Sequence, residues 1–336
     1  MKILFSGHHN PHFFTISEYL ERAIASFGHE LFVFEDRQHL IPGRIRSRSA
    51  FFHRLDLKII NQNMLTLAKS VKPDIAIITG GHRIAAQTIC HFKRLGVVSV
   101  LWTIDPPQHF QPIIDVAPFY DYIFCQGTEA IELLTRAGIR GAQWLPMACD
   151  PDVHHPVECS FSDQKKYGSD LVFVGSYYPG RAALFEKMVD FDLSIWGPGW
   201  NALNHASPLR RCIRGAHTNP AEWLKIYSAS KIILATHFHD PQNNFPVYQA
   251  SPRVFEALAC EAFVICDDQR DVFSLFKDGQ HIVCFHDSKE LIEQITYFLA
   301  HPQEHKEIAA CGRQAVLERH TYRHRIAELL ASVTHG

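Results

Sequence analysis

The feature that most constrains the fold is a strand-like run followed by a helix-like run, a pair that is repeated along the chain. KILFSG (2–7) is an apolar run of strand length, and the amphipathic segment that follows it ends at Gly28. The alternation continues to about residue 150, stops over the polar segment 151–168, and resumes with DLVFVGS (170–176). Strands that alternate with helices form parallel sheets with helices on both faces. The sequence therefore predicts two doubly wound α/β domains.

The bulk properties agree with this prediction and exclude several classes of protein. A chain of 336 residues exceeds what one hydrophobic core usually organises. Its net charge of -2 gives no reason to expect a nucleic acid or an anionic membrane as partner. The nine cysteines include no CxxC pair, which favours reduced thiols and a cytoplasmic protein. We expect no signal peptide and no integral membrane segment, because the apolar runs are too short.

One basic stretch interrupts the first domain. RQHLIPGRIRSRSAFFHR (37–54) is expected to be a loop with a short helix, and a longer helix is expected over 56–71.

In doubly wound sheets, ligands bind at the carboxyl ends of the strands, so two such sheets predict a site in the cleft between them. Neither half carries GxGxxG, GxxxxGK[ST] or GxSxG, which argues against a dinucleotide dehydrogenase, a P-loop NTPase and a serine hydrolase.

Several strand-end segments match a known pattern. They are LVFVGSYYPGR (171–181), SIWGPGW (194–200), SPRVFEALACEAFVICDD (251–268), LERHTYRHRIAELL (317–330), WTIDPP (102–107) and LPMACDPDVHHP (145–156). Together they resemble the CgeB-like group of GT-B glycosyltransferases, related to the "glycosyl transferases group 1" superfamily. The resemblance implies a GT-B fold, with two Rossmann-like domains facing a cleft and a last helix that crosses back to the first domain. It implies an acceptor-side domain over 1–160 with about 314–336, and a nucleotide-sugar domain over 161–313.

The resemblance also implies an activity. Such an enzyme, of the hexosyltransferase type (EC 2.4), moves a sugar from a nucleotide-diphosphate donor to an acceptor hydroxyl. The donor would be a UDP-, GDP- or dTDP-sugar, and no metal or other cofactor would be required. The acceptor could be a protein, a glycan, a lipid-linked sugar or a small molecule. Two alternatives stay open: a nucleotide-sugar 2-epimerase of the same fold, and a catalytically silent glycosyltransferase-like protein with a structural role.

The segment SPRVFEALAC carries the best candidates for donor binding. Ser251 begins a helix whose free N–H groups suit phosphate, and Arg253 offers a forked donor for phosphate oxygens. Glu256 resembles the second glutamate of the superfamily's E-x7-E motif, which holds the ribose hydroxyls. The first glutamate would fall at position 248, where this chain has Tyr248, so the donor sugar does not follow from the motif. The alternative for Arg253 and Glu256 is an i,i+3 surface ion pair.

Other strand ends supply further donor-side candidates. Gly175 and Ser176 would let the backbone approach phosphate, and Arg181 opens the next helix. Trp196 and Gly197 would frame the base, although Trp196 could equally be a core residue. We expect Thr236 and His237, which end the strand KIILATH, to face the cleft.

Metal binding is not expected. His237, His239 and Asp240 lie close in sequence, but no third ligand has a familiar spacing from the two histidines. Asp267 and Asp268 resemble the DxD metal motif of the other glycosyltransferase fold. At a strand end in this architecture, such aspartates more often cap the following helix.

Two residues of the first domain are candidates for catalysis. His9 lies in GHHNPH, directly after the first strand, where it could touch acceptor or phosphate. Asp105, in WTIDPP, is the best candidate for the base that accepts the acceptor hydroxyl proton. The alternatives are a solvated loop histidine and an aspartate that makes a turn before proline.

Overall fold

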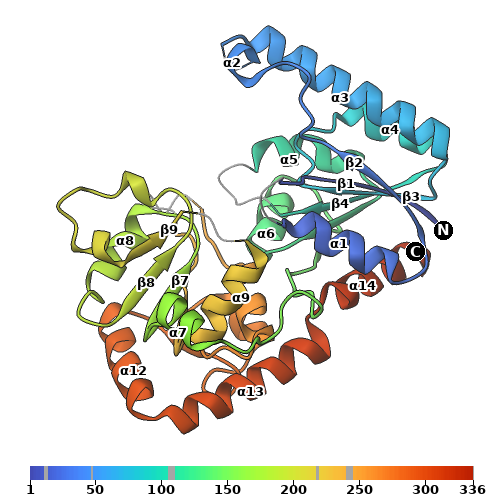
Figure 1. The fold of residues 1–336 in the computed structure, drawn as a ribbon. Coiled ribbons are helices and arrows are strands. Elements are labelled where there is room, and N and C mark those ends of the chain that lie inside the picture. The colour runs from blue at the N-terminus through green and yellow to red at the C-terminus, as the bar shows by residue number, and fades with distance from the viewer. Residues whose placement is uncertain (11–13, 47, 105–109, 217–218, 240–244, 336) are drawn as a thin grey trace. The chain divides into compact units, whose positions relative to one another are not determined.

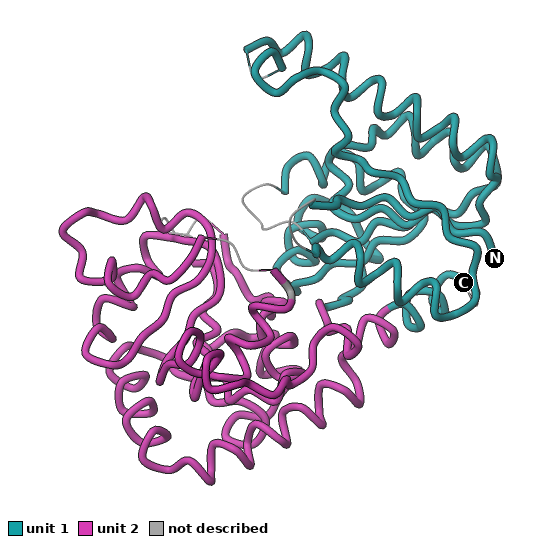
Figure 2. Tube along the Cα trace, in the orientation of Figure 1, with its two compact units in different colours: residues 1–146, 326–336 teal, residues 147–325 magenta. Residues whose placement is uncertain are grey.

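The computed structural model describes residues 1–336 except 11–13, 47, 105–109, 217–218, 240–244 and 336 (Figure 1). The chain divides into two compact units (Figure 2). Unit 1 comprises residues 1–146 and 326–336, and unit 2 comprises residues 147–325. The polar segment 151–168 therefore lies in unit 2, and the end of the chain returns to unit 1. The acceptor and donor roles of the two units stay predictions.

Unit 1 is built on six parallel strands in the order β2-β1-β3-β4-β5-β6. The strands are β1 (Lys2–Gly7), β2 (Glu30–Glu35), β3 (Ile75–Thr79), β4 (Val98–Thr103), β5 (Tyr122–Cys125) and β6 (Gln143–Trp144). The helices are α1 (Ile16–Ala25), α2 (Gly43–Arg46), α3 (Ala50–Val71), α4 (Ala86–Arg94), α5 (Gln111–Val116), α6 (Thr128–Arg136) and most of α14 (Tyr322–His335). Figure 1 shows α3 and α4 on one face of this sheet and α1 on the opposite face.

Unit 2 repeats the architecture with six parallel strands in the order β12-β11-β10-β7-β8-β9. The strands are β7 (Leu171–Val174), β8 (Leu193–Trp196), β9 (Ile213–Gly215), β10 (Ile232–Ala235), β11 (Val264–Asp267) and β12 (Val283–Phe285). The helices are α7 (Phe161–Tyr167), α8 (Pro179–Glu186), α9 (Pro220–Ala229), α10 (Pro252–Ala259), α11 (Arg270–Leu275), α12 (Ser288–Ala300) and α13 (Pro302–Arg319). The chain order reverses between β10 and β7, which is where such sheets bind ligands.

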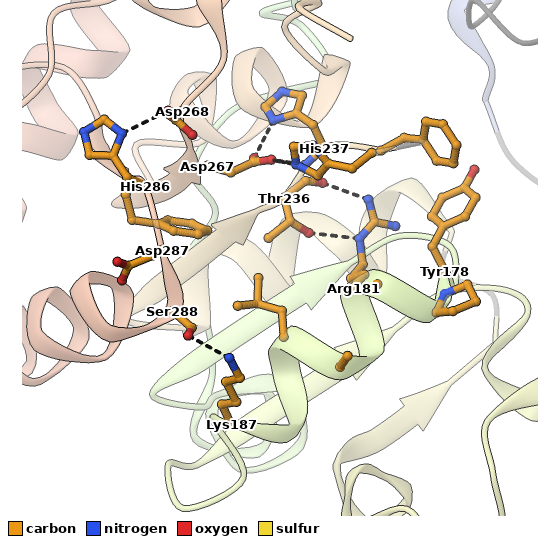
Figure 3. A pocket seen from close by; sticks show the side chains of 17 residues that line it. Tyr178, Arg181, Lys187, Thr236, His237, Asp267, Asp268, His286, Asp287 and Ser288 are labelled. Atoms are coloured by element: carbon orange, nitrogen blue, oxygen red, sulfur yellow. Dashed lines mark hydrogen bonds and ion pairs between the residues drawn. The ribbon is translucent and has the colours of Figure 1, made fainter. Parts of the chain in front are cut away.

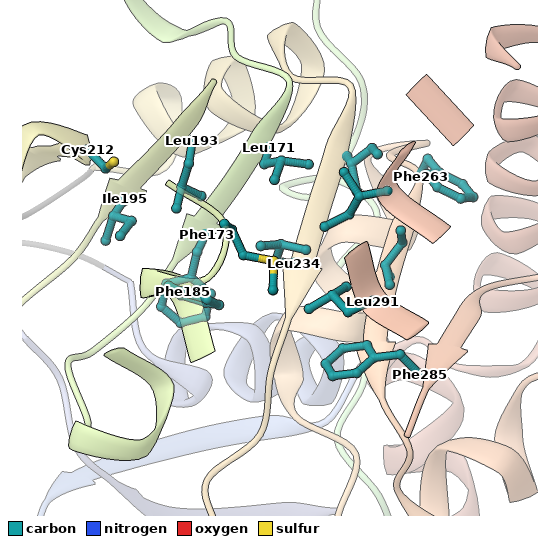
Figure 4. Close-up of a cluster of buried hydrophobic side chains, with 14 of the residues drawn as sticks. Leu171, Phe173, Phe185, Leu193, Ile195, Cys212, Leu234, Phe263, Phe285 and Leu291 are labelled. Carbon is teal, nitrogen blue, oxygen red and sulfur yellow. The ribbon is translucent and has the colours of Figure 1, made fainter. Parts of the chain in front are cut away.

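The core of unit 2 fixes the strand ends that matter for function. Phe173 of β7 packs against Phe185 of α8 with ring centroids 4.9 Å apart (Figure 4). Phe185 also stacks on Trp200. Burying a large apolar side chain contributes roughly 1.5–3 kcal/mol. The aromatic cluster therefore holds β7, α8 and the turn after β8 in a fixed register.

Local signals explain several element boundaries. Thr15 and Glu18 form a capping box at the start of α1. Asn219 caps α9, with Pro220 as the first helical residue. Across the described ranges, we find no helix with both the length and the apolar character that crossing a membrane requires.

Candidate functional site

The loops after β7 and β8 approach each other closely enough to require glycine. The Gly175 N–H donates to the Trp196 carbonyl at 2.8 Å, and the Trp200 indole donates to the Gly175 carbonyl at 3.0 Å. A Cβ at Gly197 would lie 2.3 Å from the Gly175 oxygen, and Gly197 has a φ of +133°. A Cβ at Gly175 would lie 2.3 Å from Nη2 of Arg253. Two of the predicted glycines therefore touch one another and bring the backbone against a cation.

Two arginines meet at the ends of β7 and β10. The guanidinium groups of Arg181 and Arg253 lie 4.6 and 4.7 Å from the ring centroid of Phe173. Arg181 donates to the hydroxyl and the carbonyl of Thr236 at 2.9 and 2.8 Å, and Arg253 donates to the carbonyls of Val174 and Thr236. Burial and the charge of Arg253 lower the pKa of Arg181 to about 9. Two cations held by neutral carbonyls form an edge that favours an anionic ligand.

Glu256 lies one turn after Arg253 on α10 but lies near a different group. Arg253 donates to backbone carbonyls, whereas Glu256 lies near His154, whose Nε2 is 3.9 Å from Oε1. The Glu256 side chain remains 23 % exposed. Desolvation raises its pKa to about 7, although Arg253 acts in the opposite direction. This arrangement does not resemble the surface ion pair that was the alternative.

Sequence reasoning did not identify His154, which comes from the segment LPMACDPDVHHP. Its side chain is fully buried and stacks on Trp223 with centroids 5.0 Å apart. Nδ1 accepts the Asp150 N–H at 2.8 Å, so the proton is assigned to Nε2, the nitrogen that faces Glu256. Burial lowers the pKa of His154 to about 3, so it is a neutral donor at physiological pH.

His237 connects three elements of unit 2. Its Nδ1 lies 2.6 Å from Oδ1 of Asp267, its own N–H donates to the same oxygen, and its Nε2 accepts the Ser251 N–H at 2.9 Å. His239 contacts the other Asp267 oxygen at 2.6 Å. Burial would raise the pKa of Asp267, but both histidines hold it far below its usual range. His237 and Ser251 therefore anchor the start of α10.

A pocket of about 420 Å³ opens beside Arg181, between α8 and the ends of β10, β11 and β12 (Figure 3). In Figure 3, His286 points to Asp268, which it contacts at 2.9 Å, and Lys187 reaches Ser288. No group of three or more His, Cys, Asp or Glu side chains in the described ranges is arranged to hold a metal ion. Asp240 lies outside the described residues.

Trp196, the last residue of β8, and Trp200, in the turn after it, have different roles. Trp196 is buried and lies 5.8 Å from Tyr167 of α7, with Gly215 close to its ring. This placement fits the core alternative for Trp196. Trp200, which sequence reasoning missed, is the indole that holds the Gly175 loop. The aromatic residue immediately after GPG was the available signal.

His9 of unit 1 lies between two carboxylates. Its Nδ1 is 2.9 Å from Glu35 and its Nε2 is 2.6 Å from Glu21. Burial lowers the pKa of His9, but the hydrogen bond with Glu35 and the charge of Glu21 outweigh it, so the net shift is upward. Both ring nitrogens are engaged, so His9 bridges α1 to the end of β2. Asp105, the other catalytic candidate, lies outside the described residues.

A second pocket, of about 130 Å³, lies at the carboxyl edge of the unit 1 sheet. Asp36, directly after β2, is only 5 % exposed and lines it. Its Oδ1 has no hydrogen-bond partner among the described residues. Burial raises the Asp36 pKa to about 6 against the influence of Arg83 and Arg37. Sequence reasoning missed Asp36, although a carboxylate directly after a strand was a usable signal.

Comparison with known proteins shows what this chain resembles in sequence and in fold. The family model described as "Glycosyl transferase-like" matches residues 181–331. The spore protein CgeB of Bacillus subtilis (strain 168) is 22% identical over 274 residues, which cover 78% of this chain and 84% of CgeB.

Three solved structures illustrate the likeness of the fold. HepE of Anabaena, in complex with UDP and glucose, has a TM-score of 0.68 and 16% identity, covering 99% of this chain and 100% of HepE. Sucrose-phosphate synthase of Thermosynechococcus elongatus has a TM-score of 0.71 and 12% identity, covering 99% of both chains. The lipopolysaccharide outer core galactosyltransferase WaaB has a TM-score of 0.63 and 15% identity, covering 99% of both. The predicted GT-B fold and the resemblance to CgeB are confirmed.

Proposed function

We propose that this glycosyltransferase-like protein with the GT-B fold transfers a sugar from a nucleotide-diphosphate donor to an acceptor hydroxyl. The observation that carries this proposal is the pair Arg181 and Arg253, stacked on Phe173 at the point where the strand order reverses. UDP is the favoured nucleotide, because HepE was solved with UDP, with UDP and glucose, and with UDP-glucose.

The reaction needs the kind of charge that this edge provides. The acceptor oxygen forms a bond to the anomeric carbon, the bond from that carbon to the phosphate oxygen breaks, and the diphosphate leaves with the bonding electrons. The hydroxyl proton passes to a base. Positive groups aimed at the leaving diphosphate stabilise the transition state. In this proposal the two guanidinium groups supply that charge, and no metal is required.

Glu256 is the proposed reader of the ribose. Among the described residues its carboxylate accepts no hydrogen bond, and a carboxylate can accept from both hydroxyls of a diol. His154 would support the ionised form through its Nε2 proton. Tyr248, which stands where a sugar-reading glutamate was expected, contacts Arg270 through its ring at 4.8 Å. The proposal therefore leaves the donor sugar open.

Other predicted residues keep supporting roles in the proposal. Gly175, Ser176 and Gly197 bring the backbone to the phosphates, and Thr236 and His237 hold the arginines and α10 in place. In unit 1, Asp36 would accept a hydroxyl of the acceptor, because this residue lines the pocket and its Oδ1 has no partner in the described part of the chain. Asp105 stays the predicted base.

Calorimetric titration tests the proposal directly. UDP, GDP and dTDP would be titrated into the full chain, and we expect one site with a preference for UDP. The protein would then be incubated with UDP-glucose alone, and slow release of UDP would support a transferase. Isomerised sugar would indicate the 2-epimerase instead, and failure of every nucleotide to bind would support the silent alternative.

A further inference from the structure

The start of α3 presents apolar side chains that nothing in the described part of unit 1 covers. Residues 51–55 are all exposed, with Phe51 68 % accessible. The rings of Phe51 and Phe52 contact each other, with centroids 5.5 Å apart, and not the core. We call the exposed apolar residues of this region and their basic neighbours the α2–α3 patch: Leu40, Arg44, Ile45, Arg48, Phe51, Phe52, Arg54, Leu55 and Lys58.

Further along α3, one face of the helix is packed against the core of unit 1. Ile60, Met64 and Ala68, spaced four residues apart, are buried in the core of unit 1. That spacing places them on one stripe of the helix, which faces the sheet. The first turns of α3 extend beyond this stripe together with α2 (Figure 1). Their apolar residues are therefore not core residues that happen to be partly exposed.

The charge of the patch is one-sided, although the whole chain is nearly neutral. Residues 37–58 contain six Lys or Arg and a single acid, Asp56. Asp56 is buried and accepts from His39, Arg46 and the Leu40 N–H. It fastens the loop to α3 and offers no counter-charge at the surface. The exposed arginines of the patch lie beside exposed Phe, Leu and Ile side chains.

We propose that the α2–α3 patch docks unit 1 onto a membrane surface that contains anionic phospholipid. A helix with basic residues beside exposed aromatic and aliphatic side chains suits the headgroup–acyl boundary. The charge decides against a second copy of this chain, because a two-fold contact would oppose arginine to arginine. This inference is independent of the proposed transferase activity. If both hold, unit 1 meets its acceptor at a membrane, which favours the lipid-linked sugar among the predicted acceptors.

Vesicle co-sedimentation of the full chain tests the proposal. The probes are vesicles of phosphatidylcholine with and without phosphatidylglycerol. We expect binding to the anionic vesicles to be at least about tenfold stronger and to weaken as salt is added. The triple variant Arg44→Glu, Arg48→Glu, Arg54→Glu should lose about 100-fold or more in vesicle affinity, because each cation contributes separately. The double variant Phe51→Ser, Phe52→Ser should lose about tenfold.

Matched changes elsewhere serve as controls. Phe161 is 89 % exposed in unit 2, and Lys289 is exposed on α12, so Phe161→Ser and Lys289→Glu should bind vesicles like the parent chain. Thermal unfolding and circular dichroism of every variant check folding without relying on the proposed nucleotide site. The proposal is overturned if the parent chain ignores anionic vesicles or if the patch variants bind them unchanged. A parent dimer that the patch variants convert to monomer, without vesicle binding, would instead assign the patch to self-association.

Discussion

Both units contain six parallel strands, but their strand orders differ and their carboxyl edges carry different side chains. In unit 2, Arg181 and Arg253 lie at the ends of β7 and β10 and are held by neutral carbonyls. In unit 1, the ends of β1 and β2 carry His9, Glu35 and Asp36. The unit 2 edge is arranged for an anion, whereas the unit 1 edge carries a carboxylate, Asp36, whose Oδ1 has no partner among the described residues.

This difference separates what the fold decides from what individual residues decide. Both sheets bring strand ends together where the strand order reverses, so the position of a site follows from topology. The ligand class depends on a few side chains in the strand-end loops. If the comparison holds, changes at the two edges should affect different ligands.

The largest expected effect is at Arg253. Arg253→Met keeps the aliphatic stem but removes the charge, so UDP affinity should fall by about 100-fold. Arg253→Lys should recover only part of it, because lysine lacks the fork that reaches two carbonyls. Titration calorimetry with UDP measures both. Unchanged UDP affinity in Arg253→Met would show that the carboxyl edge of the unit 2 sheet does not bind the nucleotide.

The close contact between Gly175 and Gly197 allows a second test of the unit 2 site. Gly197→Ala places a Cβ 2.3 Å from the Gly175 oxygen at a positive φ, which should cost about 1–3 kcal/mol of stability and weaken UDP binding about tenfold. Gly180→Ala, in the neighbouring helix, meets nothing within 4 Å and is the matched control. Thermal unfolding of both variants measures the loss of stability. Equal melting temperatures would show that the loops after β7 and β8 are not in contact.

Glu256 should link nucleotide binding to pH. Its folded pKa of about 7 exceeds the ordinary value of 4.5, so the parent chain loses stability as pH rises from about 4.5 to 7. UDP affinity should rise over the upper part of that range, because the ionised carboxylate binds hydroxyls best. Glu256→Gln should remove both trends and bind UDP about tenfold more weakly at pH 8. A pH-independent affinity in the parent chain would contradict the ribose role.

A substitution at Asp36 tests the carboxyl edge of the unit 1 sheet. An unpaired buried carboxylate costs stability when ionised, so Asp36→Asn should stabilise unit 1 by about 1–3 kcal/mol above pH 6. The gain should vanish below pH 4, because the folded pKa of about 6 lies above the ordinary 3.8 and the group is then neutral in both states. UDP affinity should not change. A lower melting temperature at pH 8 would assign Asp36 a structural partner.

The smallest effect is expected at His9. Its raised pKa means that the bridge between Glu21 and Glu35 stabilises the fold below pH 6.5 and is lost as pH rises through the folded value. His9→Gln should therefore lower the melting temperature at pH 6 by an amount worth less than about 1 kcal/mol, and less at pH 9. His53→Gln, at an exposed position, is the control. A greater loss at pH 9 than at pH 6 would reverse the assignment.

The architecture could be predicted because its signals are local. Runs such as IAIIT in β3 and IILA in β10 are buried along their whole length, and Asn219 with Pro220 marks the start of α9. The start of α3 at Ala50, six residues before the expected position 56, could not be predicted in this way. Phe51, Phe52 and Leu55 in its first turns are exposed, so packing against the core does not define this part of the helix.

The partners within the site could not be predicted, because they depend on distant contacts. Arg253 donates to the carbonyl of Val174, 79 residues earlier, and His154 reaches Glu256 from the polar segment 151–168, where the alternation of strands and helices stops. His9 suited catalysis by sequence position, but only the structure shows carboxylates at both ring nitrogens. Residue type and strand end indicate a site, and packing decides which groups remain available to a ligand.

The most direct test of the central claim is UDP titration of the parent chain alongside Arg253→Met and Asp36→Asn. The account predicts one UDP site in the parent chain, an affinity about 100-fold weaker in Arg253→Met, and an unchanged affinity in Asp36→Asn. No UDP binding by the parent chain, or equal losses in the two variants, would contradict it.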